Sequence, residues 1–339
     1  MKRVSIESNL PVLKNYTELI CNKKEIIVKL KACGICGSDI GNIFSNSSKP
    51  TKKIGHEISG IISKVGENIK NWKIDDKIII NHHCSCEQCH FCLHGNETMC
   101  EKFVEEIDPC GLAEYFKISN WIIEKGGIFK IPENMSFKEA TLIEPFACCL
   151  RSWKKIKVRK DDSVMIFGFG TIGIFHSIIA KEKKLERIIV DYDDFRLNFG
   201  KEEGHGEQFI VIKNLNDDKL EKYNEKMDLC IIANSDISCL NQAIEIVRKG
   251  GTILFFGEPK ADSMIEVDLS TIYSKEIRII TSYSATNDDF IKSMEFISKN
   301  NINLNKFITH DIKFEEAEKA INIAKEGKKR IKVIVSTDN

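Results

Sequence analysis

Two kinds of hydrophobic pattern follow one another along the chain. Up to about residue 145, short apolar runs alternate with turns rich in Asn and Lys, and the runs at 25–30, 58–65 and 76–80 predict strands of an antiparallel sheet. From about residue 160 onward, continuous apolar runs alternate with helical segments. That alternation is typical of a parallel sheet with helices on both faces. The pattern therefore predicts an α/β chain in which a doubly wound parallel sheet is joined to a β-rich part.

The same pattern places the elements of the second part and of the C-terminal segment. Strands are predicted at 163–167, 187–190, 228–233 and 252–256, and helices at 172–180 and in a segment that ends at 249–251. Two further helices, at 288–299 and 314–326, precede a closing strand at 331–335. No internal repeat or low-complexity tract interrupts this order.

Length and charge narrow the classes of function. The 339 residues are enough for two domains, and 50 Lys and Arg balance 50 Asp and Glu, so no overall field attracts a phosphate backbone. The basic residues near the N-terminus are not followed by an apolar signal region, and no window approaches the roughly 18 uninterrupted apolar residues of a membrane span. We expect a cytoplasmic protein with neither nucleic acid nor membrane as a partner.

Four of the 13 cysteines form a dense cluster in one turn-rich segment. Four thiolates from one short loop can close a tetrahedral zinc shell with no open position, as in structural zinc sites. Four unrelated buried cysteines and a nucleic-acid-binding zinc ribbon are the alternatives; the density of the cluster argues against the first and the neutral charge against the second. The predicted ligands are Cys86, Cys89, Cys92 and Cys100. We interpret the nearby His82, His83, Cys84, His90 and His94 as bystanders.

A second possible metal site is spread over two segments. Cys36, followed by Ser38, and the pair His56-Glu57 twenty residues later offer a thiolate, an imidazole and a carboxylate. Three protein ligands leave a position for water or substrate, as in catalytic zinc sites. The spacing alone leaves two other interpretations open: Cys33 and Cys36 as a redox dithiol, and His56 as a packed structural histidine.

A glycine-rich loop follows the apolar strand at 163–167 and opens a helix. Glycines in this context allow a tight turn and a close approach of the backbone, and the helix N-terminus presents amides to a pyrophosphate. The acidic residue Asp191, at the end of the next strand, would accept hydrogen bonds from the adenosine ribose and repel a 2′-phosphate, so NAD is favoured over NADP. Arg196 is either a solvated charge, a ribose contact or a partner for a 2′-phosphate. The predicted loop contacts are Gly168, Gly170, Thr171, Ile172 and Gly173.

Taken together, these residues resemble the zinc-containing medium-chain alcohol and polyol dehydrogenases over essentially the whole chain. The resemblance implies a Rossmann NAD-binding domain at 148–283, inserted into a β-rich GroES-like catalytic domain made of 1–147 and 284–339 with a structural zinc lobe at 84–100. It also implies two zinc ions per chain and a homodimer or homotetramer. The motifs that carry it, besides the two cysteine groups and the glycine loop, are Gly55-His56-Glu57, Gly60, Gly66 to Ile69, the segment 75–78 and the segment 111–115.

The resemblance also implies roles for individual residues. Cys36 and His56 would bind the catalytic zinc, and Ser38 would take the substrate proton. Glu57 is an adjacent carboxylate, and Glu144, in a Glu-Pro motif typical of sorbitol, threonine and sugar-phosphate dehydrogenases, is a third ligand or a substrate contact. Gly41 stands where relatives often have a histidine that continues the proton relay.

We therefore predict a zinc-dependent oxidoreductase that transfers a hydride between a secondary alcohol and NAD. A hydroxylated small molecule such as a polyol, a cyclitol, a sugar or a sugar phosphate is the first expectation, and a simple alcohol or threonine the alternative. Two rivals remain: a non-catalytic protein that binds zinc and NAD, and a zinc-free quinone reductase of the same superfamily. We expect the histidines of the nucleotide-binding part, His176 and His205, to be structural or solvent-facing.

Overall fold

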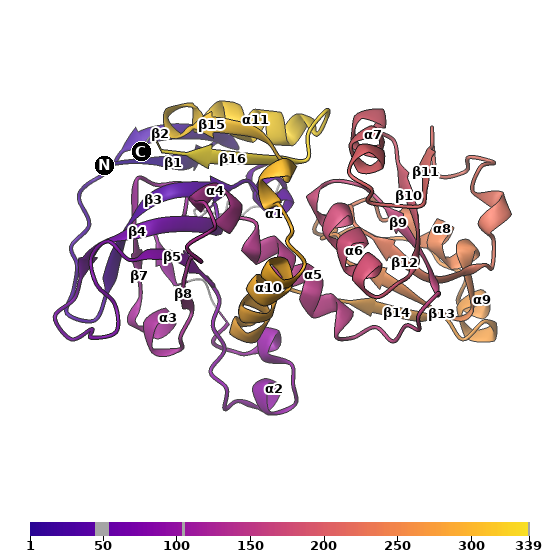
Figure 1. Ribbon diagram of the computed structural model, residues 1–339, viewed down its shortest axis with the longest axis horizontal. Helices are drawn as coiled ribbons and strands as arrows, with labels where there is room; N and C mark the ends of the chain where they lie inside the picture. Colours follow the sequence, from indigo (N-terminus) through magenta and orange to yellow (C-terminus); the bar gives the residue numbers. More distant parts are fainter. Residues whose placement is uncertain (45–53, 104–105, 338–339) are drawn as a thin grey trace. The chain divides into compact units, whose positions relative to one another are not determined.

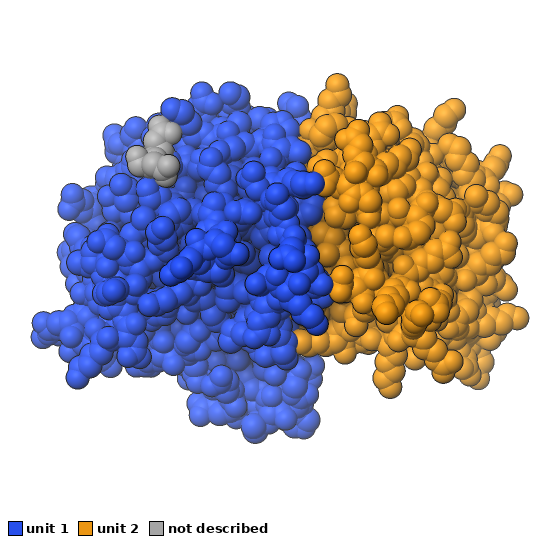
Figure 2. Space-filling view, in the orientation of Figure 1, with its two compact units in different colours: residues 1–147, 284–327, 332–339 blue, residues 148–283, 328–331 orange. Residues whose placement is uncertain are grey.

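The computed structural model describes residues 1–44, 54–103 and 106–337. The chain forms two compact units, shown in different colours in Figure 2. The first unit comprises residues 1–147, 284–327 and 332–339, and the second comprises 148–283 and 328–331. The segment 328–331 therefore groups with the second unit, whereas the sequence analysis assigned it to the first.

The second unit is built on a six-stranded parallel sheet (Figure 1). Its strands are β9 (Ser163–Phe167), β10 (Glu186–Asp191), β11 (Gln208–Val211), β12 (Met227–Ile232), β13 (Val247–Phe255) and β14 (Arg278–Thr281). They lie in the order β11-β10-β9-β12-β13-β14. This is the doubly wound Rossmann order, in which the order of the strands reverses between the first strand, β9, and the fourth, β12. Ligands of such sheets bind at this switch, outside the carboxyl ends of the strands.

Continuous apolar runs explain the central strands of this sheet. Every residue of β9 is buried, as expected for a strand covered on both faces. The helices of this unit are α6 (Thr171–Glu182), α7 (Asp194–Glu202), α8 (Cys239–Ile246) and α9 (Leu269–Ser274). The helix predicted to end at 249–251 ends at Ile246 instead, because β13 already begins at Val247 and uses those residues.

The first unit contains an eight-stranded, largely antiparallel sheet and a separate two-stranded one. The main path runs β15-β16-β3-β4-β5-β8, β7 pairs with β3 and β6, and only β15 and β16 are parallel to one another. Its strands are β3 (Ile26–Gly34), β4 (Glu57–Val65), β5 (Lys77–Ile80), β6 (Ile107–Asp108), β7 (Tyr115–Ile118), β8 (Ile128–Lys130), β15 (Ile308–Lys313) and β16 (Lys332–Ser336), and the hairpin is β1 (Lys2–Glu7) with β2 (Leu10–Asn15). The antiparallel β-rich part predicted from the sequence is thus confirmed.

Short helices and turns connect these strands. They are α1 (Gly37–Phe44), α2 (His90–Leu93), α3 (Asn120–Glu124), α4 (Phe137–Ala140), α10 (Asn287–Lys299) and α11 (Ala317–Glu326), with 3₁₀ turns at Glu97–Met99, Leu304–Phe307 and Phe314–Glu316; α5 (Ile143–Trp153) leads into the second unit. Ser136 and Thr286 begin α4 and α10 with capping boxes, which satisfy free backbone N–H groups at each helix start. Within the described ranges, no helix has the length and apolar character needed to cross a bilayer.

Candidate active site and nucleotide-binding loop

The pairing of β3 with β4 brings the two segments of the candidate metal site together. Gly34, the last residue of β3, lies opposite Glu57, the first residue of β4. Cys36 follows β3 and His56 precedes β4, so both project from the same end of this strand pair. The ligand atoms of Cys36, His56 and Glu57 all lie within 4.8 Å of one another. The structure thus gathers the three residues that the sequence left as a weak cluster, and their donor set fits a zinc ion with one open position.

Asp39, which the sequence analysis did not single out, orients the histidine. Its buried carboxylate accepts the backbone N–H groups of Cys36 at 3.1 Å and Gly55 at 3.0 Å, and it lies 3.4 Å from Nδ1 of His56. A carboxylate on one imidazole nitrogen fixes the tautomer and leaves the other nitrogen for a metal. Burial alone would lower the pKa of His56, but the charges of Asp39 and Cys36 outweigh it and hold this pKa well above its usual range.

The serine predicted to move the proton lies next to Cys36, one of the candidate metal ligands. Ser38 Oγ donates a hydrogen bond to Sγ of Cys36 at 3.2 Å. Gly41 lies one helical turn further along α1, and no atom of the described residues lies within 4 Å of the place where its side chain would begin. The hydroxyl of Ser38 therefore lies beside the candidate metal ligands.

Glu57 has a second partner that the sequence did not indicate. Its carboxylate forms an ion pair with Lys332 of β16, and both side chains are at most 5% exposed. Lys332 Nζ also donates to the carbonyl of Ile35 at 3.3 Å. Gly34 makes room for this pair, because a Cβ at that position would overlap Oε2 of Glu57. Lys332 thus holds the carboxylate of Glu57 beside the other two candidate ligands.

Glu144 lies in the first turn of α5 and is buried. It is not among the three residues whose ligand atoms converge in the described part of the chain. Its role as a third ligand or substrate contact stays a prediction.

Two histidines at the end of β5 extend the candidate site. The ring of His82 lies 4.9 Å from the ring of His56, and the ring of His83 lies 4.1 Å from that of His82. Burial, together with the neighbouring imidazoles, lowers the pKa of His82 well below its usual range, and the same causes lower the pKa of His83 to about 4. The sequence grouped both with the cysteine cluster, but His82 lies beside the candidate catalytic group.

The four predicted structural ligands do converge. Among the described residues, the sulfurs of Cys86, Cys89, Cys92 and Cys100 form the second group with metal-ligand geometry. Backbone N–H groups donate to two of them, from Cys89 to Cys86 at 3.3 Å and from Cys86 to Cys100 at 3.2 Å. The backbone N–H of Cys92 lowers the pKa of Cys89 to about 6, so a thiolate is available there at neutral pH. This arrangement fits a closed tetrahedral zinc site.

In the second unit, the glycine loop has the geometry that a pyrophosphate requires. Gly168 has a φ of +91°, which a side chain would strain, and a Cβ at Gly173 would overlap the carbonyl of Gly168. Gly170 caps α6 and has open space at its Cβ position, so a ligand can approach this backbone closely. Thr171 and Ile172 form the first turn of α6, and Thr171 Oγ1 donates to the carbonyl of Ile331 at 2.8 Å.

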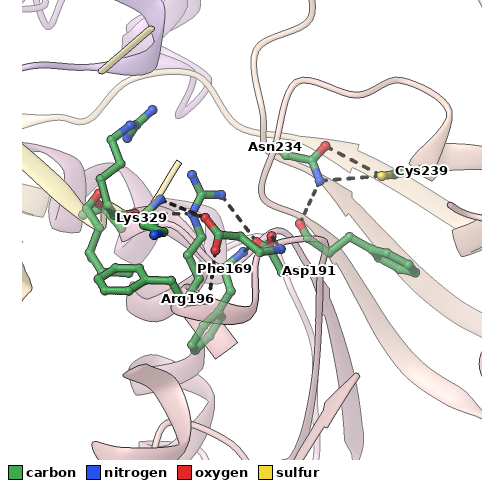
Figure 3. Close-up of polar contacts among 12 residues, drawn as sticks. Phe169, Asp191, Arg196, Asn234, Cys239 and Lys329 are labelled. Atoms are coloured by element: carbon green, nitrogen blue, oxygen red, sulfur yellow. Dashed lines mark hydrogen bonds and ion pairs between the residues drawn. The ribbon is translucent and has the colours of Figure 1, made fainter. Parts of the chain in front are cut away.

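Asp191 lies at the end of β10 and is tied to the glycine loop (Figure 3). Its Oδ2 accepts the backbone N–H of Phe169 at 2.5 Å, and Oδ1 accepts that of Asp193 at 2.8 Å. Arg196 of α7 places Nη1 3.5 Å from Oδ2 and donates from Nε to the carbonyl of Arg330 at 3.3 Å. Both charges border a pocket of about 220 Å³ next to the loop. Arg196 is therefore partly buried beside Asp191 rather than a solvated charge.

Asn234 is a pocket residue that the sequence analysis missed. It follows β12, donates from Nδ2 to the carbonyl of Phe167 at 3.3 Å and lines the same pocket (Figure 3). Asn234 directly follows a central strand at the point where the strand order reverses, and this position could have indicated a role in ligand binding. His176 is structural, as expected: it is fully buried in α6, Trp153 Nε1 donates to its Nδ1 at 3.0 Å, and burial lowers its pKa to about 3.

Comparison with known protein families matches both units. Residues 22–132 match the family model described as alcohol dehydrogenase GroES-like domain. Residues 171–299 match the model described as zinc-binding dehydrogenase. Together the two models cover most of the chain and agree with the two sheets found in the structure.

Individual proteins match along nearly the full length. D-xylulose reductase A of Aspergillus niger is 26% identical over 335 residues, which is 94% of this chain and 92% of that protein. Sorbitol dehydrogenase of Arabidopsis thaliana is 27% identical over 325 residues, covering 91% and 88%. The structure of a zinc-binding dehydrogenase from Sinorhizobium meliloti 1021, bound to NADP, superposes with a TM-score of 0.85 at 21% identity and covers 99% of this chain and 98% of that one. This last likeness shows the fold.

Proposed function

The chain belongs to the zinc-containing medium-chain polyol dehydrogenases, a family of zinc-dependent oxidoreductases, and we propose that it transfers a hydride between a secondary hydroxyl group of a polyol and NAD. The observation that carries this proposal is the convergence of Cys36, His56 and Glu57 beside Ser38 in the first unit. A second observation supports it: in the second unit, Asp191 lies beside the glycine loop and accepts the backbone N–H of Phe169.

The residues of the first unit fit a catalytic zinc. Cys36 and His56 would hold the ion, with Glu57 or Glu144 as the third protein ligand. When bound, zinc supplies Lewis-acid chemistry that lowers the pKa of an alcohol toward neutrality. Asp39 keeps the imidazole of His56 in the tautomer that binds a metal.

Ser38 accepts the proton that leaves the substrate hydroxyl. A serine hydroxyl can accept one hydrogen bond while it donates another, so it can pass a proton onward without a net charge of its own. Gly41 has no side chain that could supply the next step in a relay, so the proton would pass from Ser38 to water. When bound, NAD accepts the hydride, and the fold supplies its binding and orientation.

We propose NAD rather than NADP as the preferred cofactor. The carboxylate of Asp191 is fixed at the pocket by two backbone N–H groups, so it cannot easily turn away from a 2′-phosphate. Arg196 offsets part of that charge, and the contact at 3.5 Å is long. The balance favours the ribose hydroxyls of NAD.

We also propose two zinc ions per chain, a homo-oligomer and a cytoplasmic location. The four-cysteine group supports the second, structural ion. Strand β14 ends the six-stranded sheet as described and carries a half-exposed Ile279, and an edge strand of this kind can pair with a second copy. The cysteines of the described residues form no disulfide bond, which fits a reducing compartment.

The test measures absorbance of NADH at 340 nm with zinc-loaded protein, NAD⁺ or NADP⁺, and a panel of polyols, cyclitols, sugar phosphates, threonine and simple secondary alcohols. A polyol hit that disappears in Cys36→Ala and His56→Ala supports the proposal. Preference for threonine or a simple alcohol would replace the substrate assignment. Silence in both directions, with zinc and NADH bound, would favour the non-catalytic alternative.

A further inference from the structure

A row of aromatic rings leads away from the candidate metal ligands. His82 lies 4.9 Å from His56, His83 lies 4.1 Å from His82, and Phe103 lies 4.8 Å from His83, all measured between ring centroids. His82 is thus the ring next to the ligand imidazole, with His83 behind it. His82 is therefore in contact with one of the three candidate metal ligands.

His82 is buried and His83 is partly buried, and one ring nitrogen of each is buried without a hydrogen-bond partner among the described residues. His82 is 6% exposed, and Nδ1 of His82 and of His83 finds no partner within residues 1–44, 54–103 and 106–337. A buried polar atom without a partner is unfavourable, and such atoms in folded proteins call for an explanation such as a ligand. A phenylalanine would fill a similar volume without this cost, so packing alone does not explain an imidazole at position 82.

We propose that His82, supported by His83, is the specificity-determining contact of the substrate site and hydrogen-bonds a hydroxyl group on a carbon next to the reacting one. This inference rests on the proposed function and narrows its substrate class. A neutral imidazole has one donor and one acceptor, which is what a hydroxyl group also has. A half-turn of the ring about its Cβ–Cγ bond exchanges Nδ1 with a carbon, so the polar edge can face a bound substrate.

The charges around this pair favour a neutral polyol over a sugar phosphate. The thiolate of Cys36 and the carboxylates of Asp39 and Glu57 are balanced by the two charges of a bound zinc ion and by Lys332. No positive charge of this group is left over for a phosphate.

The experiment compares His82→Phe with wild type on two substrates, a polyol from the active panel and a secondary alcohol of similar size without a neighbouring hydroxyl. We expect kcat/KM for the polyol to fall roughly 10- to 100-fold, while that for the simple alcohol changes less than about threefold. His82→Asn keeps a donor and an acceptor, so it should recover part of the preference for the polyol. His90→Phe, the same change at an exposed position, should leave both values unchanged.

A spectroscopic measurement covers the case in which a variant does not fold. In wild-type protein with ¹⁵N-labelled histidine, polyol added to the zinc- and NADH-loaded enzyme should shift the ring nitrogen signals of His82, whereas the simple alcohol should not. Equal losses for both substrates in His82→Phe, or unshifted His82 signals with bound polyol, would overturn the inference. If no polyol is oxidised but the His82 signals still shift, the proposed function fails and the binding contact stands.

Discussion

Replacing Lys332 with methionine would leave the buried carboxylate of Glu57 without its cation. Only 5% of the Lys332 side chain and 1% of the Glu57 side chain are exposed, so water replaces the lost partner poorly. Removing one member of a buried ion pair costs about 3–5 kcal/mol, because a charge is left uncompensated. We therefore expect Lys332→Met to lower the free energy of unfolding of the metal-free first unit by about 3–5 kcal/mol.

Amide hydrogen exchange read by mass spectrometry measures this free energy unit by unit. Peptides from β3, β4 and β16 report on the sheet that carries the pair, and peptides from β9 report on the other unit. The matched control is Lys319→Met, which removes an ion pair with Glu316 whose side chains are 61% and 53% exposed. That surface pair should contribute less than about 1 kcal/mol.

A double variant separates the charge from the loss of packing. Adding Glu57→Gln to Lys332→Met removes the unpaired carboxylate, so it should recover most of the lost stability. Zinc should reduce the effect of Lys332→Met alone, because a cation beside Cys36 and His56 offers the carboxylate another partner. The reasoning fails if Lys332→Met costs no more than Lys319→Met, or if the double variant is less stable than the single one.

Three further predictions concern other parts of the chain. His176 has a pKa of about 3 in the folded state and about 6.5 in the unfolded state, so the folded state binds fewer protons and stability falls as the pH drops below 6.5. In urea unfolding, this group should lower the free energy of unfolding by about 2 kcal/mol at pH 5 relative to pH 8. The variant His176→Asn should lack this pH-dependent loss. An unchanged pH dependence in that variant would contradict the assignment. Asp191→Asn keeps an acceptor for the backbone N–H of Phe169 but removes the negative charge. The ratio of kcat/KM for NADP⁺ to kcat/KM for NAD⁺ should therefore rise roughly tenfold or more. A constant ratio would mean that Asp191 does not select the cofactor. Cys92→Ser should lower the zinc content measured by mass spectrometry from about two ions per chain to about one, and an unchanged content would exclude this cysteine as a ligand.

Short sequence patterns were sufficient to predict much of the second unit. The run at 163–167 is apolar throughout and is followed directly by glycines, and the strand β9 has those bounds. The glycine loop and Asp191 were recognisable because the strand, turn and helix that give them meaning are contiguous in sequence. The four cysteines were found for the same reason, since a structural zinc loop is a local motif.

Residues that act through distant partners were not recognisable. Asp39 stands three residues after Cys36 and has no distinguishing pattern. Its role depends on Gly55 and His56, which lie in the segment just before β4. His82 was grouped with the nearest cysteines along the chain, although its ring contacts that of His56. Proximity in the sequence thus suggested no partner for Asp39 and the wrong neighbours for His82.

The register of three neighbouring strands decides which side chains meet at the candidate metal site. Gly34 of β3 lies opposite Glu57 of β4 on one side and opposite Ile334 of β16 on the other. This register brings Lys332 of β16 to the carboxylate of Glu57. Lys332 also contacts Ile35, which is 297 positions away in the sequence. Because successive side chains of a strand point to opposite faces, a shift of one residue in either pairing would turn Lys332 or Glu57 away. The sequence predicts each of these strands, but their order in the sheet is a property of the folded chain, and the ion pair depends on that order.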